Sequence, residues 1–205
     1  MGGEGRARRE RAEAERLARF EERCALLEAE GMRGQDRTFS QRASALLGFL
    51  CALPFAAGVA VAFFFRGGKS WLLTGNLFAD LALYVAVFLA SIPVHECLHA
   101  LGWAAAKGSF AGLRICLAGG APYCACAQPL GRWRYLAGTL APFFVLGAGL
   151  SAAGIAAASL PLTLYGAFNL LNAGADVLVS LRALAARGLL LDHPSRCGFY
   201  AFSRA

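Results

Sequence analysis

The sequence predicts an all-α membrane protein with about four transmembrane helices, a short β-hairpin-like loop between the second and third, and an N-terminal cytosolic helix. Three observations support this fold class. Hydrophobic residues make up 58% of the 205 residues and charged residues only 16%, whereas soluble domains are about 45–50% apolar and about 25% charged. Four apolar segments each approach the roughly 20 residues that cross a bilayer. More than half of the charged residues lie in the first 42 positions.

Residues 1–42 are the first predicted region, a charged cytosolic N-terminal helix. They contain ten Arg and nine acidic residues, and Arg and Glu often lie four positions apart, which stabilises a helix in water. One narrow apolar stripe has four members at helical spacing: Leu17, Phe20, Cys24 and Leu27. The stripe either rests on the membrane domain or binds a protein partner or the membrane surface.

Residues 43–185 are the second predicted region, a polytopic membrane domain. Its apolar segments cover about residues 43–65, 77–106, 135–160 and 162–185. The second segment is longer than one crossing needs and contains Pro93. The third and fourth segments are joined so closely that they must form an antiparallel helical hairpin. Residues 186–205 are the third region, a cytosolic C-terminal tail.

Basic residues predict the orientation in the membrane. The N-terminal region, the 107–134 loop and the C-terminal tail carry most of the Lys and Arg, whereas the opposite side carries only Arg66 and Lys69. Cytoplasmic loops are enriched in Lys and Arg, so both termini are expected in the cytoplasm. The net charge of +7 is therefore explained by topology, and no nucleic-acid partner is expected.

The 107–134 loop is predicted to be a hairpin tucked against the helices near the cytoplasmic face. Its Gly and Pro residues disfavour a helix, and the alternation from Leu113 to Leu117 suits a short strand. Three of the seven cysteines, Cys116, Cys124 and Cys126, lie in this loop. They either pack as small apolar side chains or belong to a second metal site, and the apolar surroundings favour packing.

An H-E-x-x-H motif at His95–Glu96–His99 is the strongest chemical signal. Positions i and i+4 share one face of a helix, so both imidazoles can bind one metal ion, with the Glu acting on its water. Such polar side chains are costly in an apolar segment unless they are paired. The alternative is a polar cluster that packs helices, with the imidazoles bonded to backbone or to Asp80.

A catalytic zinc needs a third protein ligand, for which Asp176 and His193 are the candidates. The two motif histidines lie roughly 10–17 Å before the cytoplasmic end of their segment, and Asp176 roughly 13 Å before the end of its own. These depths coincide, whereas His193 lies beyond the last segment, so Asp176 is predicted. Asn172, one turn earlier, could orient a ligand or hold a substrate, and Asn169 is a weaker candidate for the same role.

The chain resembles the putative zincin peptidase family of small bacterial multi-pass membrane proteins. The motifs that carry the resemblance lie within about residues 85–200: His95-Glu96-Cys97-Leu98-His99, Tyr123-Cys124, Pro129, Ala141-Pro142 and Asn172-x-x-x-Asp176. The chain is also distantly similar to the site-2 proteases, which are intramembrane metalloproteases. These resemblances imply a bacterial plasma membrane, Zn²⁺ bound by His95, His99 and Asp176, and Glu96 as the catalytic base.

These observations predict a membrane-embedded zinc metalloprotease that cleaves a peptide bond in a membrane protein or membrane-associated substrate. Two other classes remain open. One is a membrane adaptor or regulatory protein with a structural or vestigial zinc site, acting through its N-terminal helix. The other is a transporter or metal carrier, which the lack of an internal repeat disfavours. Glu96 favours the protease, because a structural site does not need that carboxylate.

Overall fold

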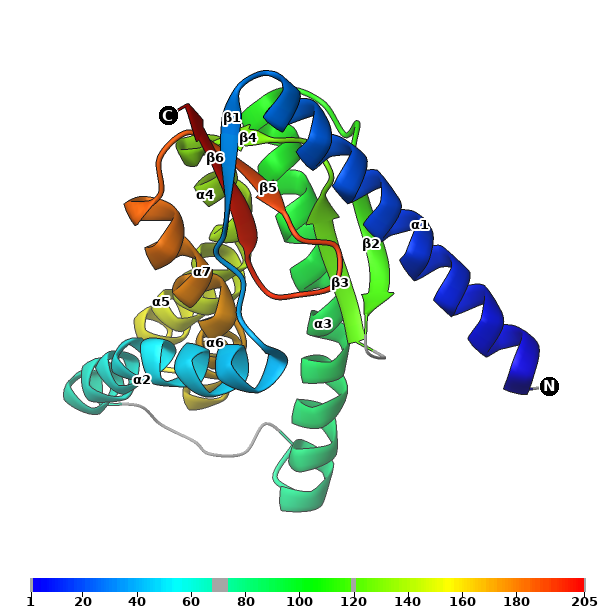
Figure 1. Cartoon of the computed structure of the whole chain (residues 1–205). Coiled ribbons are helices and arrows are strands. Elements are labelled where there is room, and N and C mark those ends of the chain that lie inside the picture. The colour runs from blue at the N-terminus through cyan, green and yellow to red at the C-terminus, as the bar shows by residue number, and fades with distance from the viewer. Residues whose placement is uncertain (1, 68–73, 119–120, 205) are drawn as a thin grey trace.

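The computed structural model describes residues 2–67, 74–118 and 121–204. The molecule is mostly helical, and within the described residues it also contains two antiparallel sheets (Figure 1). In chain order the elements are α1 (Gly2–Ala29), β1 (Met32–Asp36), α2 (Gln41–Arg66), α3 (Leu77–Lys107), β2 (Leu113–Ala118), β3 (Ala121–Cys126), β4 (Leu130–Gly131), α4 (Arg132–Thr139), the π-helical segment η1 (Phe143–Gly149), α5 (Leu150–Ala156), α6 (Leu160–Asn172), α7 (Gly174–Ala185), β5 (Leu189–Asp192) and β6 (Phe199–Arg204).

The helices α2 and α3 are each long and apolar enough to cross a membrane. Two further groups meet the same criterion only when each is taken as one bent span. One joins α4 to η1 and α5 with a bend of 44°, and the other joins α6 to α7 with a bend of 50°. The described part of the chain therefore offers two to four spans, where the sequence predicted about four.

The boundaries of α3 follow from its end residues. The Asn76 side chain accepts hydrogen bonds from the amides of Phe78 and Ala79 at 2.9 and 3.2 Å, which satisfies amides that the first helical turn leaves free. Gly108 ends the helix at φ +75°, a left-handed conformation that glycine adopts without strain. Pro93 lies inside α3 and does not end it.

Close contact between two glycines sets the position of α7 against α2. A Cβ atom on Gly48 would lie 2.6 Å from the amide nitrogen of Ala175, and one on Gly174 would lie 2.3 Å from the Gly48 carbonyl oxygen. Both are shorter than real contacts allow, so only glycine fits at these two positions. The contact lies at the start of α7, two residues before Asp176.

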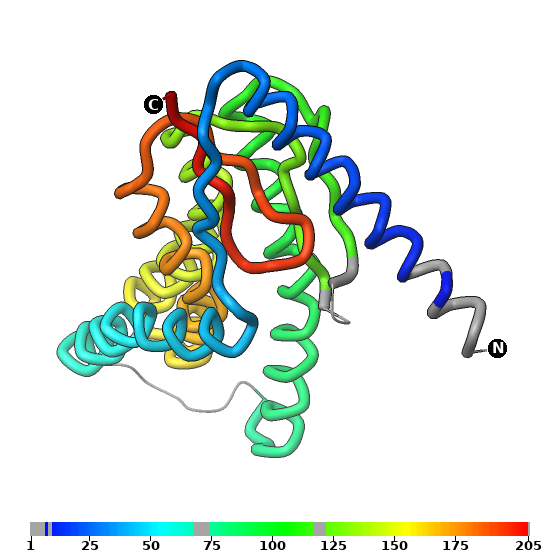
Figure 2. The backbone as a smooth tube through the Cα atoms, in the orientation of Figure 1, coloured from blue at the N-terminus to red at the C-terminus, as the bar shows by residue number. Residues whose placement is uncertain are grey.

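The predicted hairpin in the 107–134 loop is confirmed. β2 and β3 pair antiparallel, with Leu113 opposite Cys126 and Ile115 opposite Cys124. A second sheet was not predicted: its strand order is β1-β6-β5-β4, and it includes half of the residues of the predicted C-terminal tail. The trace in Figure 2 shows the first and last strands side by side.

The main core lies where this four-stranded sheet meets the helices. Trp103, Tyr135, Val179, Leu190 and Phe199 are buried there, and they come from α3, α4, α7, β5 and β6. The core therefore ties the C-terminal strands to the helices that carry the candidate site.

The apolar stripe of α1 packs on the protein's own sheet. Leu27 forms a buried cluster with Leu191 and Phe202, and Phe20 and Cys24 pack against it. Leu17, the first member of the stripe, is 39% exposed. The C-terminal half of the stripe thus rests on strands of the C-terminal region, and not on the predicted membrane domain at 43–185.

Substitution of Gly48 tests the glycine contact. We expect Gly48→Ala to lower the thermal midpoint of the detergent-solubilised protein, because overpacking costs about 1–3 kcal/mol. Gly58→Ala is the matched control, since it lies in the same helix and no neighbouring atom lies within 4 Å of the place its Cβ would take. That variant should be neutral or stabilising by about 0.5–1 kcal/mol. Equal midpoints for the two variants would contradict the close contact.

Candidate metal centre

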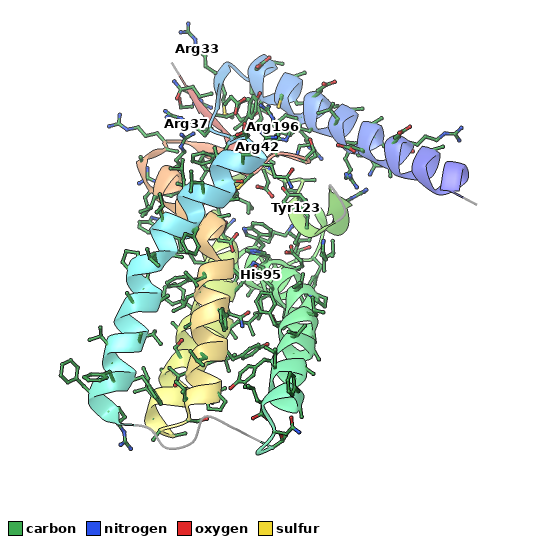
Figure 3. The ribbon with its side chains drawn as sticks, turned by 90° about the horizontal axis from the view of Figure 1, so that it is seen from below. Arg33, Arg37, Arg42, His95, Tyr123 and Arg196 are labelled. Atoms are coloured by element: carbon green, nitrogen blue, oxygen red, sulfur yellow. The ribbon has the colours of Figure 1, made fainter. Side chains whose placement is uncertain are left out.

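Two histidines of α3 point from one face of the helix into the protein. His95 and His99 are both buried, and their rings lie 4.8 Å apart, centroid to centroid. Figure 3 shows His95 on α3 facing the neighbouring helices, with Tyr123 between it and the sheet end of the molecule, where Arg196 lies.

Asp176 reaches the same place from α7. One carboxylate oxygen lies 3.1 Å from Nε2 of His95, and the other lies 3.5 Å from Nε2 of His99. The candidate ligand atoms of the three residues all lie within 4.8 Å of one another. The sequence predicted that Asp176 and the two histidines lie at the same depth, and in the structure Asp176 contacts both histidines.

The orientation of His99 is set by its second nitrogen. Nδ1 lies 2.9 Å from the carbonyl oxygen of Gly138. A carbonyl can only accept a hydrogen bond, so Nδ1 carries a proton, and Nε2 is the nitrogen that faces Asp176. This arrangement is usual for histidines that bind metals, because the second hydrogen bond fixes the ring and its tautomer.

The imidazole ring of His99 also packs against Trp103. The two rings stack at 5.6 Å with an interplanar angle of 23°, and the Trp103 indole donates a hydrogen bond to the Tyr135 carbonyl at 2.9 Å. A Cβ on Gly138 would lie 2.1 Å from the Trp103 ring. Glycine at 138 therefore lets α4 approach closely enough to hold His99.

These three side chains fit a zinc ion. Two imidazoles and one carboxylate are a ligand set found in catalytic zinc sites, and ligands at about 2.0–2.2 Å from a tetrahedral ion lie about 3.3 Å from one another. The contacts of Asp176 at 3.1 and 3.5 Å are close to that spacing and use its two different oxygens, and one ligand atom from each of the three residues lies within 4.8 Å of the others. The buried Nδ1 of His95 has no hydrogen-bond partner among the described residues.

Glu96 and the metal-binding group share one cavity. The cavity has a volume of about 590 Å³ and is also lined by Asn172. Oε2 of Glu96 accepts a hydrogen bond from the Cys124 amide of strand β3 at 2.5 Å. The hairpin thereby positions the carboxylate that the sequence predicts as the base.

The remaining candidates lie elsewhere. Asn169 is buried in the helix packing and donates to the Tyr165 carbonyl at 2.9 Å, and it is not among the described residues that line the cavity. Asp80 accepts two hydrogen bonds from Thr74, so the alternative partner for the imidazoles is engaged at the far end of α3. Cys124 and Cys126 are buried in the main core.

His193 is outside the metal-binding group. Its Nδ1 accepts hydrogen bonds from the amides of Ser195 and Arg196 at 3.2 and 3.0 Å. Burial and the nearby Arg196 lower the pKa of His193 to about 4. This ring is neutral at physiological pH and serves the turn between β5 and β6.

Asp192 is a cavity residue that the sequence interpretation missed. Its carboxyl group accepts hydrogen bonds from the Tyr135 hydroxyl at 2.9 Å, the Tyr123 hydroxyl at 3.2 Å and the Cys126 amide at 3.4 Å. Burial raises the pKa of Asp192 to about 7, although these donors act in the opposite direction. The apolar run that precedes it, 189–191, was the one sequence signal of a buried strand.

Comparisons with known proteins agree with the resemblance seen in the sequence. Residues 88–187 match the model of a family described as "Putative zincin peptidase". The matched region contains His95, Glu96, His99 and Asp176, so the family resemblance is confirmed for this part of the chain. Searches among curated proteins and among solved structures found no match, and the similarity to site-2 proteases stays a prediction.

The ligand set can be tested by metal binding alone. We expect His95→Ala and Asp176→Asn to weaken zinc binding at least tenfold, because each removes one of three protein ligands. His193→Gln is the matched control and should bind zinc as the wild type does. Competition with a chromogenic chelator measures the affinities. Wild-type affinity in Asp176→Asn would exclude it as a ligand.

Asp192 should give stability a distinct pH dependence. Its folded-state pKa of about 7 exceeds the unfolded value of about 3.9. Between these values the folded state holds a proton that the unfolded chain releases. This contribution to stability therefore falls as pH rises from about 4 to about 7, by at most about 1.4 kcal/mol per pH unit.

The comparison of wild type with Asp192→Asn isolates this contribution, because His193 titrates in both proteins. The variant stays neutral at position 192, so its thermal midpoint relative to wild type should be higher at pH 8 than at pH 5. A midpoint difference that does not change with pH would show that Asp192 is not protonated near neutrality.

Proposed function

We propose that this chain, which matches the putative zincin peptidase family over residues 88–187, is a membrane-embedded zinc metallopeptidase. It hydrolyses a peptide bond in a membrane protein or a membrane-associated substrate. One observation carries the proposal: His95, His99 and Asp176 converge in a cavity that also contains the Glu96 carboxylate.

His95, His99 and Asp176 are the proposed zinc ligands. A zinc ion held there would lower the pKa of water in the site towards neutrality and polarise a carbonyl oxygen. The Gly138 carbonyl keeps Nε2 of His99 directed to the site. The contact between Gly48 and Gly174 keeps α7, and with it Asp176, against the rest of the bundle.

Glu96 is the proposed general base and then the general acid. Its Oε2 is engaged by the Cys124 amide, and Oε1 is left to accept a proton from the attacking water. The water oxygen bonds to the substrate carbonyl carbon. Glu96 then returns the proton to the amide nitrogen, the C–N bond breaks, and a carboxyl group and an amine leave.

The cavity-facing edge of β3 is the proposed position of the substrate backbone. The amides of Cys124 and Cys126 point away from β2, towards Glu96 and Asp192. Because Glu96 and Asp192 already accept the hydrogen bonds of these amides, an extended substrate segment would lie along this edge beside Glu96 without replacing them. A helical substrate must first unwind, because its backbone carbonyls are otherwise hydrogen-bonded within the helix.

The proposed location is a bacterial plasma membrane with both termini in the cytoplasm. Arg33, Arg37, Arg42 and Arg196 lie at the sheet end of the molecule in Figure 3. Basic residues at one end of membrane helices favour the cytoplasmic side. The site would then lie in the cytoplasmic half of the bilayer, next to the sheet.

Replacement of Glu96 separates catalysis from metal binding. We expect Glu96→Gln to retain zinc and to lose peptide cleavage by about 10²–10⁴-fold, the usual contribution of a general base. Glu28→Gln, on the exposed side of α1, is the matched control. Cells that express each variant can be compared for new termini in membrane proteins by mass spectrometry. Fragments that persist in Glu96→Gln would contradict the role of Glu96.

A further inference from the structure

A second pocket lies outside the metal cavity, between α1 and the β2–β3 hairpin. Its volume is about 280 Å³, and its walls come from α1, the hairpin and the end of β5. α1 packs on the sheet through Phe20, Cys24 and Leu27, and in Figure 1 the helix continues along the outer side of the hairpin. The pocket lies between these two elements.

Four arginines from two elements line this pocket. Arg16, Arg19 and Arg23 lie on one side of α1, and Arg114 comes from β2 opposite. Nε of Arg16 is buried without a hydrogen-bond partner among the described residues. Arg19 is 3.7 Å from Glu15, whereas Arg23 and Arg114 form no ion pair with any described residue.

The acidic residues of the pocket do not balance these charges. Glu22 and Asp192 are the acidic residues among the described lining. Both carboxyl oxygens of Asp192 are already engaged, by Tyr135 on one side and by Tyr123 and Cys126 on the other. With Arg19 paired to Glu15, three arginines face at most two anions, which leaves a net positive charge around the half-buried Arg16.

We propose that this pocket binds a small phosphate-bearing anion through Arg16, Arg23 and Arg114. Guanidinium groups bind phosphate in a bidentate manner and with charge-assisted hydrogen bonds. A phosphate carries up to two negative charges, so it balances the pocket better than a single carboxylate. The volume suits a phosphate with a small organic group and excludes a folded partner.

The ligand would contact the strand that positions Glu96. Tyr123 and Asp192 line both the basic pocket and the metal cavity, so they form a shared wall. The residue after Tyr123 is Cys124, whose amide holds Glu96. A phosphate in the basic pocket would therefore lie on the opposite side of this shared wall from the metal cavity.

Binding to the full-length, detergent-purified protein tests the site without zinc and without any substrate. The soluble probes are inorganic phosphate and glycerol 3-phosphate, compared with chloride at equal ionic strength. The lipid probes are nanodiscs of phosphatidylglycerol and of phosphatidylcholine. We expect a saturable rise in thermal midpoint, and at least tenfold weaker binding in Arg16→Gln/Arg114→Gln.

The charge-matched control is Arg11→Gln/Arg33→Gln, which removes two exposed arginines outside the pocket. It should bind as the wild type does. Binding of the soluble probes identifies a free phosphate ligand, and binding only in phosphatidylglycerol nanodiscs identifies a lipid headgroup. No binding of any probe, or equal loss in both double variants, would overturn the proposal. Neither result depends on whether the chain is a peptidase.

Discussion

Two buried imidazoles and a half-buried carboxylate between mostly apolar helices are the constraint on which the rest of the structure depends. Polar side chains in such surroundings cost free energy unless they are paired. Here the pairing is mutual, since Asp176 contacts both His95 and His99. It requires α3 and α7 to meet at one depth, and glycines at 48, 138 and 174 permit the close backbone and ring packing that brings them there.

The two sheets complete this arrangement from the cytoplasmic end that we propose. The Cys124 amide fixes Glu96 beside the histidines, and Asp192 ties the same strand, β3, to α4 and β5. The hairpin and the C-terminal region thus line one end of the cavity. A site with a volume of about 590 Å³ and a carboxylate beside the ligands suits a reaction better than a purely structural zinc, which is usually fully coordinated by protein.

Much of the site was predictable because its signals are local or repeat with known geometry. The i, i+4 spacing places His95 and His99 on one helical face, and counting residues from the segment ends brings Asp176 to the same depth. The hairpin followed from alternation between Leu113 and Leu117. The four-stranded sheet was not predictable, because β1 and β6 are far apart in the chain and their pairing leaves no local pattern. For the same reason Asp192 appeared to be a tail residue.

The helix bends also escaped prediction. Hydropathy counts apolar residues and does not register the break at Pro142 or the close approach at Gly174. At these positions the two predicted straight spans are bent, between α4 and η1 and between α6 and α7. Asp176 lies just after the second bend.

X-ray absorption of the zinc-loaded, full-length protein tests the central claim most directly, because it reports the atoms bound to the metal. His95, His99 and Asp176 predict a first shell of nitrogen and oxygen at about 2.0–2.2 Å with the scattering of two imidazoles. Cys124 and Cys197 line the same cavity, so sulfur ligation is the physical alternative. A sulfur shell at about 2.3 Å, or the absence of imidazole scattering, would contradict the account.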